Sequence, residues 1–318
     1  MADFYLDFEK PLKVIDQKII EMETSDDPDS KRSRIEELKE QRKQELESIF
    51  SGLTRWQRVQ IARHPQRPFS LDYIQKLAPD FVELHGDRHF ADDPSLVGGL
   101  GSIDGQSILF IGQQKGRNTN ENLFRNFGMM RPEGYRKALR LMKLAEKFNV
   151  PIVSLIDTPG AYPGIGAEER GQGEAIAKNL LEMSRLKVPI LVIIIGEGAS
   201  GGALGIGVCD RMLMLENTWY SVISPEGCAS ILWRDAALAS NAADAMKVTP
   251  KDLLEMGICD RIIAEPLGGA HRKPDKMVES LKSVILEELN ALLQTDPDAF
   301  LDQRISRYDA MGVFTESA

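Results

Sequence analysis

Cysteine is scarce in this sequence of 318 residues, and its three copies, Cys209, Cys228 and Cys259, lie far apart. Their spacing contains no Cys-x-x-Cys pair and therefore predicts neither a zinc site nor a disulfide framework. The opening residues, Met-Ala-Asp-Phe-Tyr, do not have the character of a secretory leader, and no apolar run reaches membrane-spanning length. From these absences we expect a chain with no metal and no membrane partner, working in the reducing cytoplasm.

An excess of basic residues is missing as well. The 39 Lys and Arg residues are outnumbered by 48 Asp and Glu, so the net charge is −9 and the isoelectric point is about 5.2. The average field of such a chain repels phosphate backbones, which argues against nucleic acid as the main partner. Apolar residues make up 42% and charged residues 27%, as is typical of a globular protein with one large domain or two smaller ones.

Two helices are predicted within residues 8–50, because apolar residues recur there at helical spacing. A break with turn residues, Ser25-Asp26-Asp27-Pro28-Asp29-Ser30, separates them. The pattern predicts an antiparallel helical hairpin with charged outer faces. Such a hairpin buries too little surface to stand alone, so it must dock on the rest of the chain or on a partner. The apolar positions are Leu12, Ile15, Ile19, Met22, Ile35, Leu38, Leu46 and Ile49.

The chain beyond the hairpin alternates strand and helix patterns, which indicates the α/β class. Alternating residues over 97–111, with a turn at Asp104-Gly105, predict a β-hairpin. Apolar runs at 151–156 and 188–195 predict buried parallel strands, joined by a right-handed crossover through a helix over 167–185. The remaining elements expected are helices over 71–84, 132–148 and 275–294 and from Pro225, and strands at 212–215, 220–223 and 260–264. The residues from Thr295 onward show no clear pattern and predict a loosely attached tail.

Two polar loops contain residues that could bind a metal or a phosphate. The loop 85–94 contains two His and three Asp, which could bind a metal, but local hydrogen bonds and Asp–Arg pairs are the favoured interpretation. In the loop 113–117, Lys115 and Arg117 flank a glycine at a strand end, where they could hold a phosphate. A solvated loop is the alternative there, and the residues alone do not decide between the two.

Glycine gathers after the strand at 188–195, in the stretch 196–207. Gly201 and Gly202 have no Cβ, so a ligand oxygen could approach their N–H groups at the start of a helix. A second glycine turn, containing Gly160 and Ala161, follows the neighbouring strand. Parallel strands end at the same edge of a sheet, so N–H groups of both turns could converge on one oxygen as an oxyanion hole. A tight strand-to-helix crossing that needs small residues for packing is the alternative.

Other chemistries fit these motifs less well. Ser200, in Ala-Ser-Gly-Gly, resembles the nucleophile turn of Clp-type proteases, but none of the four His residues follows it where that family places its base. The stretch 196–207 lacks the Gly-Lys-Ser/Thr ending of a P-loop. Glu197 and Glu226 could act as acid and base, as in an enoyl-CoA hydratase. Helix capping or pairing with Arg is the favoured interpretation for both.

Several longer segments are specific enough to compare with a known family. In chain order they are Ala-Arg-His-Pro-Gln-Arg-Pro (62–68), Arg-Asn-Phe-Gly-Met (125–129), Pro-Glu-Gly-Tyr-Arg-Lys-Ala-Leu-Arg-Leu-Met (132–142), Asp-Thr-Pro-Gly-Ala-Tyr-Pro-Gly-Ile-Gly-Ala-Glu-Glu-Arg-Gly-Gln (157–172), Gly-Glu-Gly-Ala-Ser-Gly-Gly-Ala-Leu (196–204), Tyr-Ser-Val-Ile-Ser-Pro-Glu-Gly-Cys-Ala-Ser-Ile-Leu-Trp (220–233) and Glu-Pro-Leu-Gly-Gly-Ala-His-Arg (265–272). They resemble the carboxyltransferase alpha subunits of bacterial acetyl-CoA carboxylase. The resemblance extends from the N-terminal hairpin to about residue 290.

The resemblance implies a crotonase/Clp-protease-like superhelix of ββα units. It divides the chain into a hairpin (1–55), a carboxyltransferase domain (56–295) and a tail (296–318). It also implies transfer of a carboxyl group from carboxybiotin, on a separate carrier protein, to acetyl-CoA, giving malonyl-CoA for fatty acid synthesis. The implied partners are a zinc-ribbon beta subunit in an alpha2beta2 assembly, the biotin carboxyl carrier protein and the ATP-using biotin carboxylase. The family is thought to use decarboxylated biotin as the base, which accounts for a site without a catalytic His.

Site residues follow from the resemblance by position. The N–H groups of Gly201 and Gly202, with a donor near Gly160 or Ala161, would form an oxyanion hole facing the biotin carbonyl. The pocket wall would contain Tyr162, Pro163 and Gly164, and the residues holding the CoA phosphates or acyl end would be Arg170, Lys115 and Arg117. The active site would lie between alpha and beta, so the single chain would be inactive. The alternatives are a stand-alone crotonase-type acyl-CoA decarboxylase or hydratase, and a non-catalytic assembly subunit.

Overall fold

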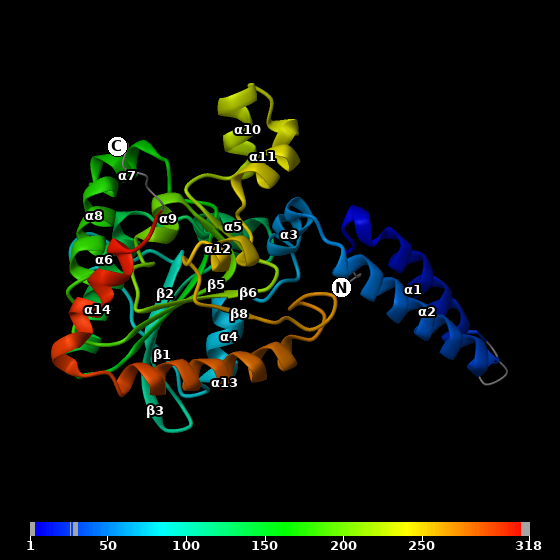
Figure 1. The fold of residues 1–318 in the computed structure, drawn as a ribbon, viewed down its shortest axis with the longest axis horizontal. Coiled ribbons are helices and arrows are strands. Elements are labelled where there is room, and N and C mark those ends of the chain that lie inside the picture. The colour runs from blue at the N-terminus through cyan, green and yellow to red at the C-terminus, as the bar shows by residue number, and fades with distance from the viewer. Residues whose placement is uncertain (1–3, 26, 28–30, 313–318) are drawn as a thin grey trace, which may run out of the picture.

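The computed structural model describes residues 4–25, 27 and 31–312 and has a single large sheet at its centre (Figure 1). Its main path runs β1-β2-β3-β4-β5-β6-β8, and β7 pairs with the end of β5. The first three strands are antiparallel, and the pairs from β3 onward are parallel. The strands are β1 (Val82–Glu83), β2 (Leu96–Ile103), β3 (Gln106–Gln113), β4 (Ile152–Thr158), β5 (Ile190–Ala199), β6 (Arg211–Leu215), β7 (Trp219–Ser221) and β8 (Arg261–Ile263).

Helices cover both faces of the sheet, which explains why β4 and β5 are buried along their whole length. On one face α6 (Pro132–Lys147), α8 (Gln172–Met183) and α9 (Ser200–Leu204) contribute to one apolar cluster. On the other face α4 (Ser70–Leu77) and α13 (Pro274–Leu293) contribute to a second. The result is a three-layer α/β domain, as the sequence predicts.

The predicted hairpin is confirmed as α1 (Lys10–Glu23) and α2 (Arg32–Ser51), which extend away from the sheet (Figure 1). It has its own small apolar cluster around Ile15 and Leu38. At its base the Arg272 side chain donates to Glu9 over 3.1 Å and so ties the hairpin to the main domain. Most of the predicted break at 25–30 lies outside the described residues, and no helix in the described part of the chain has the length and apolar character needed to cross a bilayer.

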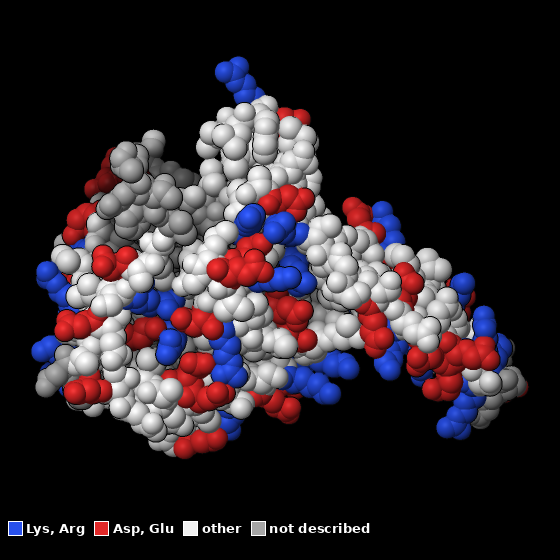
Figure 2. Space-filling view, in the orientation of Figure 1, with Lys and Arg blue, Asp and Glu red and all other residues white. Residues whose placement is uncertain are grey.

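A second projection is formed by α10 (Pro225–Trp233) and α11 (Ala239–Met246), with a short 3-10 turn, η4 (Ala236–Leu238), between them (Figure 1). Ser224 caps α10 by accepting from the Gly227 N–H, and Pro225 occupies the first turn. Figure 2 shows that the visible face of this projection has few charged side chains, in contrast to the mixed charges over the main domain. Its exposed apolar side chains include Ile231, Leu232 and Trp233.

The remaining described elements connect these parts. They are η1 (Asp7–Glu9), α3 (Arg55–Ala62), α5 (Thr119–Phe124), η3 (Asn126–Gly128), α7 (Ile165–Glu169), α12 (Pro250–Glu255) and α14 (Pro297–Asp309).

Three predictions need correction. The helix expected over 71–84 ends at Leu77, because Pro79 follows closely and a proline ring opposes continuation. The helix expected over 167–185 is two helices, α7 and α8, separated by Gly171 at a left-handed φ of 81°. The strand expected to end at residue 195 continues as β5 to Ala199, because its last residues pair with β7.

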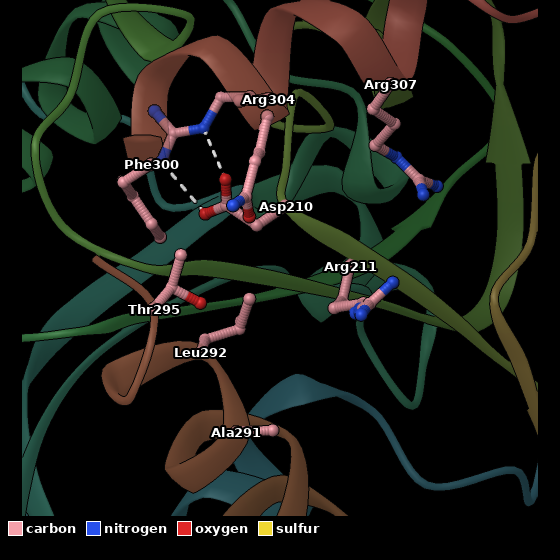
Figure 3. A pocket seen from close by; sticks show the side chains of 9 residues that line it. Asp210, Arg211, Ala291, Leu292, Thr295, Phe300, Arg304 and Arg307 are labelled. Carbon is pink, nitrogen blue, oxygen red and sulfur yellow. Dashed lines mark hydrogen bonds and ion pairs between the residues drawn. The ribbon is translucent and has the colours of Figure 1, made fainter. Parts of the chain in front are cut away.

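The segment from Thr295 onward is also not the loose tail that the sequence predicts. Its helix α14 is anchored by Arg304, which is buried and bonded to both carboxylate oxygens of Asp210 at 2.7 and 2.8 Å (Figure 3). Arg304 also donates to the carbonyl oxygens of Met183, Leu186 and Val188. A cavity of about 160 Å³ lies beside this cluster, between α13 and α14. The helix is therefore fixed by polar side chains, since Arg307 also bonds Asp260 and the Tyr308 hydroxyl accepts from the Cys209 N–H.

Candidate active site

The carboxyl ends of β4 and β5 lie side by side, as expected of parallel neighbours, and the two glycine turns meet there. A Cβ on Gly202 would stand 2.2 Å from the carbonyl carbon of Gly160 and 2.5 Å from the Ala161 nitrogen. Only glycine allows two backbones to approach so closely. The predicted convergence of the two turns is thus present in the structure. Gly201 has more room, since a Cβ there would meet Ile176 at an ordinary 3.5 Å.

The first turn leaves one amide available. The Gly160 N–H donates to the Thr158 hydroxyl over 3.2 Å, and that hydroxyl donates to the Gly160 carbonyl over 2.8 Å. The Ala161 N–H, in contrast, finds no acceptor within the part of the chain that the structure describes. Of the two amides in which the sequence predicts a donor, only that of Ala161 is therefore without an acceptor in the described residues. A Cβ on Gly160 would have open space around it, which shows that the turn faces a gap.

The second turn is sharp. Ser200 adopts a left-handed φ of 58°, which is uncommon for a residue with a side chain, and the chain passes there directly from β5 into α9. Ser200 is exposed, Gly201 is partly exposed and Gly202 is buried. This geometry places the first amides of α9 beside the Gly160–Ala161 peptide.

A network of charged side chains, with the carboxylates of Asp157 and Glu197 buried at its centre, lies beside the turns. Lys115 donates to Asp157 over 2.7 Å and to Glu197 over 2.8 Å, and Arg63 bonds Glu197 over 2.5 Å. Arg63 also bonds Glu226 at the start of α10. The network thus joins the loop after β3, the ends of β4 and β5, α3 and the α10 projection. Glu197 and Glu226 pair with Arg, which confirms the favoured interpretation of these two carboxylates.

The charges of the network stabilise one another against burial. Burial disfavours the ionised form of Glu197, but Lys115 and Arg63 outweigh this effect and hold its pKa below the ordinary value. Burial likewise disfavours the charge of Lys115, and Asp157 and Glu197 outweigh it and raise its pKa. Both groups are therefore charged at neutral pH. Neither has the shifted pKa that a general acid or base working near pH 7 requires.

A cavity of about 370 Å³ opens next to the network. Its walls include Lys115, Arg117 and Glu197, as well as Pro159 from the first glycine turn. The lining of that cavity includes neither Gly201 nor Gly202. The structure thus brings Lys115 and Arg117 together in one cavity, which the amides of Gly201 and Gly202 do not line. Its other walls come from Ala62, Arg63, His64, Pro65, Phe69, Gly116, Asn122 and Phe127.

The basic residues predicted to hold CoA all have partners within the chain. Arg117 donates to the carbonyl oxygens of Pro65 and Arg67, bonds Asp72, and lies 4.0 Å above the Phe69 ring. Arg170 bonds both oxygens of Glu133 and is absent from the lining of the 370 Å³ cavity. Both basic side chains of the 113–117 loop therefore bond within the chain, Lys115 in a partly buried position and Arg117 in an exposed one.

The predicted pocket wall lies just after the first turn. The Tyr162 ring lies 4.6 Å below the guanidinium of Arg131, and the Tyr162 carbonyl accepts from Gln172 over 3.0 Å. A Cβ on Gly164 would stand 2.3 Å from the Tyr162 ring, so any other residue at position 164 would collide with that ring in its present position. Pro163 is exposed between them.

The loop 85–94 is organised by local hydrogen bonds, as favoured from its sequence. One oxygen of Asp87 accepts from the N–H groups of His89, Phe90 and Ala91, and the other bonds Arg136. Within the described residues no group of three or more His, Cys, Asp or Glu side chains is placed to hold a metal.

Three residues of the site were not assigned from the sequence. Arg63 joins two carboxylates, Asp157 accepts from Lys115, and the buried Gln113 bridges the two turns. A signal was available for two of them, because Gln113 and Asp157 each stand at the carboxyl end of a predicted strand, where α/β folds gather their site residues. Arg63 gave no such signal, since its partner Glu197 is 134 residues away.

Solved structures with this arrangement of sheet and helices place the chain in a fold class. A chain of the Pseudomonas malonate decarboxylase heterotetramer, solved with coenzyme A, has a TM-score of 0.60 at 18% identity, over 76% of this chain and 95% of that one. Transcarboxylase 12S, with methylmalonyl-coenzyme A bound, has a TM-score of 0.54 at 22% identity. This alignment covers 67% of this chain but only 41% of the transcarboxylase chain. The fold is the crotonase type of these enzymes.

Sequence comparison narrows the class to one family. The family model described as acetyl co-enzyme A carboxylase carboxyltransferase-like matches residues 5–312. A Chlorobium phaeobacteroides protein is 56% identical over 327 residues, covering 98% of both chains, and a Xanthomonas campestris protein is 54% identical over 312 residues with the same coverage. Both are named acetyl-coenzyme A carboxylase carboxyl transferase subunit alpha. The chain belongs to this family of carboxyltransferase alpha subunits.

Proposed function

We propose that this chain supplies the biotin-facing half of a carboxyltransferase that moves a carboxyl group from carboxybiotin to acetyl-CoA and so forms malonyl-CoA. The observation that carries the proposal is the close approach of Gly202 to the Gly160–Ala161 peptide, which brings the two glycine turns into direct contact. In the reaction implied by the family, the N–C bond of carboxybiotin breaks to give CO2 and a biotin anion, which takes a methyl proton from acetyl-CoA. The resulting enolate then attacks the CO2 to form malonyl-CoA.

The chain's own contribution is positioning and charge stabilisation. The N–H groups of Ala161 and of Gly201 and Gly202 would bind the biotin carbonyl oxygen, which becomes more negative as the carboxyl group leaves. Each such donor is worth roughly 2.7–4 kcal/mol when it is fixed before the reaction. Since two carboxylates already neutralise Lys115, we assign it to holding the strand ends and Arg117 to contact with the CoA phosphates. Tyr162, Pro163 and Gly164 would form the wall beside the biotin ring, and Arg170 would hold the start of α8.

The site is open where a second chain would complete it. We propose a zinc-ribbon beta subunit as that chain, in an alpha2beta2 assembly served by the biotin carboxyl carrier protein and by an ATP-using biotin carboxylase. The exposed apolar side chains of α10 support this arrangement, because the Arg63–Glu226 pair fixes α10 to the site and large exposed apolar surfaces mark contact regions. A double variant, Leu232→Ser with Trp233→Ser, should co-purify less well with the beta subunit, whereas Leu254→Ser on α12 should not change recovery.

The experiment that tests the function is a malonyl-CoA synthesis assay with a free carboxybiotin derivative. The single chain should be inactive, and the complex purified with its beta subunit should form malonyl-CoA. Turnover of an acyl-CoA by the single chain would instead support a stand-alone decarboxylase or hydratase, and an active complex that tolerates bulk at Gly202 would support a purely structural role for the glycine turns.

A further inference from the structure

The ladder between β4 and β5 is interrupted where the two glycine turns begin. Ile156 pairs with Ile194, but the next pair is Thr158 with Gly198. One residue of β4, Asp157, therefore lies opposite three residues of β5, 195–197. An irregularity of this kind bends the strand and removes the backbone groups around it from the regular ladder. The N–H groups of Asp157 and Glu197 therefore need other acceptors, since a buried N–H without one is costly.

Two side chains supply these acceptors. The Gln113 side-chain oxygen accepts from the Asp157 N–H over 3.1 Å, and the Asp157 carboxylate accepts from the Glu197 N–H over 3.0 Å. The Gln113 amide nitrogen then donates to the Gly202 carbonyl over 2.7 Å. One side chain from the end of β3 is thus bonded to the strand that leads into the first turn and to the helix that follows the second.

Gln113 is itself held on all sides. It is fully buried, its carbonyl accepts from the Ser70 hydroxyl over 2.7 Å, and its backbone pairs with Leu96 in β2. Only one orientation of its amide places oxygen toward an N–H and nitrogen toward a carbonyl, so rotating the group would lose both bonds. The side chain is therefore a rigid spacer between the Asp157 and Gly202 backbones.

We infer that Gln113 is a positioning residue for carboxyl transfer, setting the separation of the amides that meet at Gly202 and Ala161. This inference rests on the proposed oxyanion hole. Gln113 acts through the backbone and touches no substrate itself. A displacement of about 1 Å in such donors costs about 100-fold in rate. The loss should therefore appear in kcat rather than in the KM for acetyl-CoA, because Gln113 does not line the cavity that contains Arg117.

The test compares two neighbouring buried glutamines in the complex with the beta subunit. Gln113→Met keeps the length of the side chain and removes both bonds. Gln114→Met is the matched control, because Gln114 also accepts one N–H, from Leu71, and donates to one carbonyl, that of Lys115, but bonds neither turn. We expect both variants to lower the melting temperature similarly. Gln113→Met should lower kcat 10- to 100-fold with the KM for acetyl-CoA within about two-fold, whereas Gln114→Met should retain kcat.

A third variant distinguishes a failure of the role inferred for Gln113 from a failure of the proposed function on which that role rests. Gly202→Ala forces the two turns apart directly, and combining it with Gln113→Met should add little further loss of kcat, because both act on the same separation. Normal kcat in Gly202→Ala would overturn the oxyanion hole itself. A low kcat in Gly202→Ala beside a normal kcat in Gln113→Met would overturn only the role of Gln113, as would fully multiplicative losses in the double variant.

Discussion

The two ends of strand β5 both meet arginines paired with carboxylates, yet they differ in which polar groups are left without a hydrogen-bond partner. At the amino end, Arg304 uses all five of its N–H donors, on Asp210 and on three carbonyl oxygens. Asp210 in turn accepts from the first N–H of the strand, that of Ile190, over 2.7 Å. Nothing in this cluster remains for a ligand, and its effect is to fix α14 against the sheet (Figure 3).

The carboxyl end is built from the same residue types but is not closed. Arg63 and Lys115 bridge the carboxylates there, a cavity of about 370 Å³ adjoins them, and the Ala161 N–H has no acceptor within the described residues. Ser200 holds a left-handed conformation that strand and helix alone do not require. Buried charge therefore does not identify a site by itself. What distinguishes the carboxyl end is an N–H group without an acceptor in the described residues beside a left-handed residue that carries a side chain, which makes it the candidate site.

The largest effect that this comparison predicts is on stability at the amino end. Arg304→Met should lower the free energy of unfolding by about 3–5 kcal/mol, because it leaves Asp210 buried without its charge partner. Urea unfolding would measure the loss, with Arg34→Ala, from an exposed pair on α2, as a control that should show no measurable change. Carboxyl transfer per folded complex should stay normal. A loss of kcat at permissive temperature would mean that the two ends are coupled.

At the carboxyl end the predicted effect is on turnover. Gly202→Ala should reduce kcat by about 10²–10³-fold, since its new methyl group overlaps the Gly160–Ala161 peptide and separates the donors. Gly201→Ala is the matched control, because a Cβ there meets only the Ile176 side chain at an ordinary distance. It should stay within about five-fold of the parent. Equal kcat losses in the two variants would show that helix α9, rather than the contact between turns, sets the rate.

The smallest predicted effect is the contribution of Glu197 to the loss of folding stability at acid pH. The pKa of Glu197 is depressed in the folded chain, so its ionisation stabilises the fold fully above the ordinary value near 4.5 and loses that contribution as the pH falls through the depressed value. Glu197→Gln should therefore flatten the decline in stability below pH 4.5, measured by urea unfolding across pH, while lowering stability at pH 7. A decline as steep as that of the parent chain would assign the acid sensitivity to other groups.

Features that depend on local sequence pattern or on neighbouring strands could be predicted from the sequence. The hairpin turn at Asp104-Gly105, the parallel strands β4 and β5, and the meeting of the Gly160 and Gly202 turns could all be predicted. The reason is that each depends on residues close in sequence or on the rule that parallel strands share an edge.

What could not be predicted depends on distant partners. Residues 196–199 form the end of a strand because β7 pairs with them, and α14 is held by a carboxylate 94 residues away. The charges of Lys115 and Arg117 pointed to phosphate binding. Both side chains are paired with carboxylates, among them Asp157 and Asp72, which offset part of the positive charge that a phosphate would meet. Charge alone does not reveal which side chains are already paired, since pairing is a property of the folded chain.

The most direct test of the central claim is a crystal structure of the chain with its beta subunit and biotin. The account predicts the biotin carbonyl oxygen about 2.7–3.1 Å from the Ala161 nitrogen and from the Gly201 or Gly202 nitrogen, beside the cavity that contains Lys115. A biotin carbonyl bound elsewhere, with these amides facing only protein atoms, would contradict it.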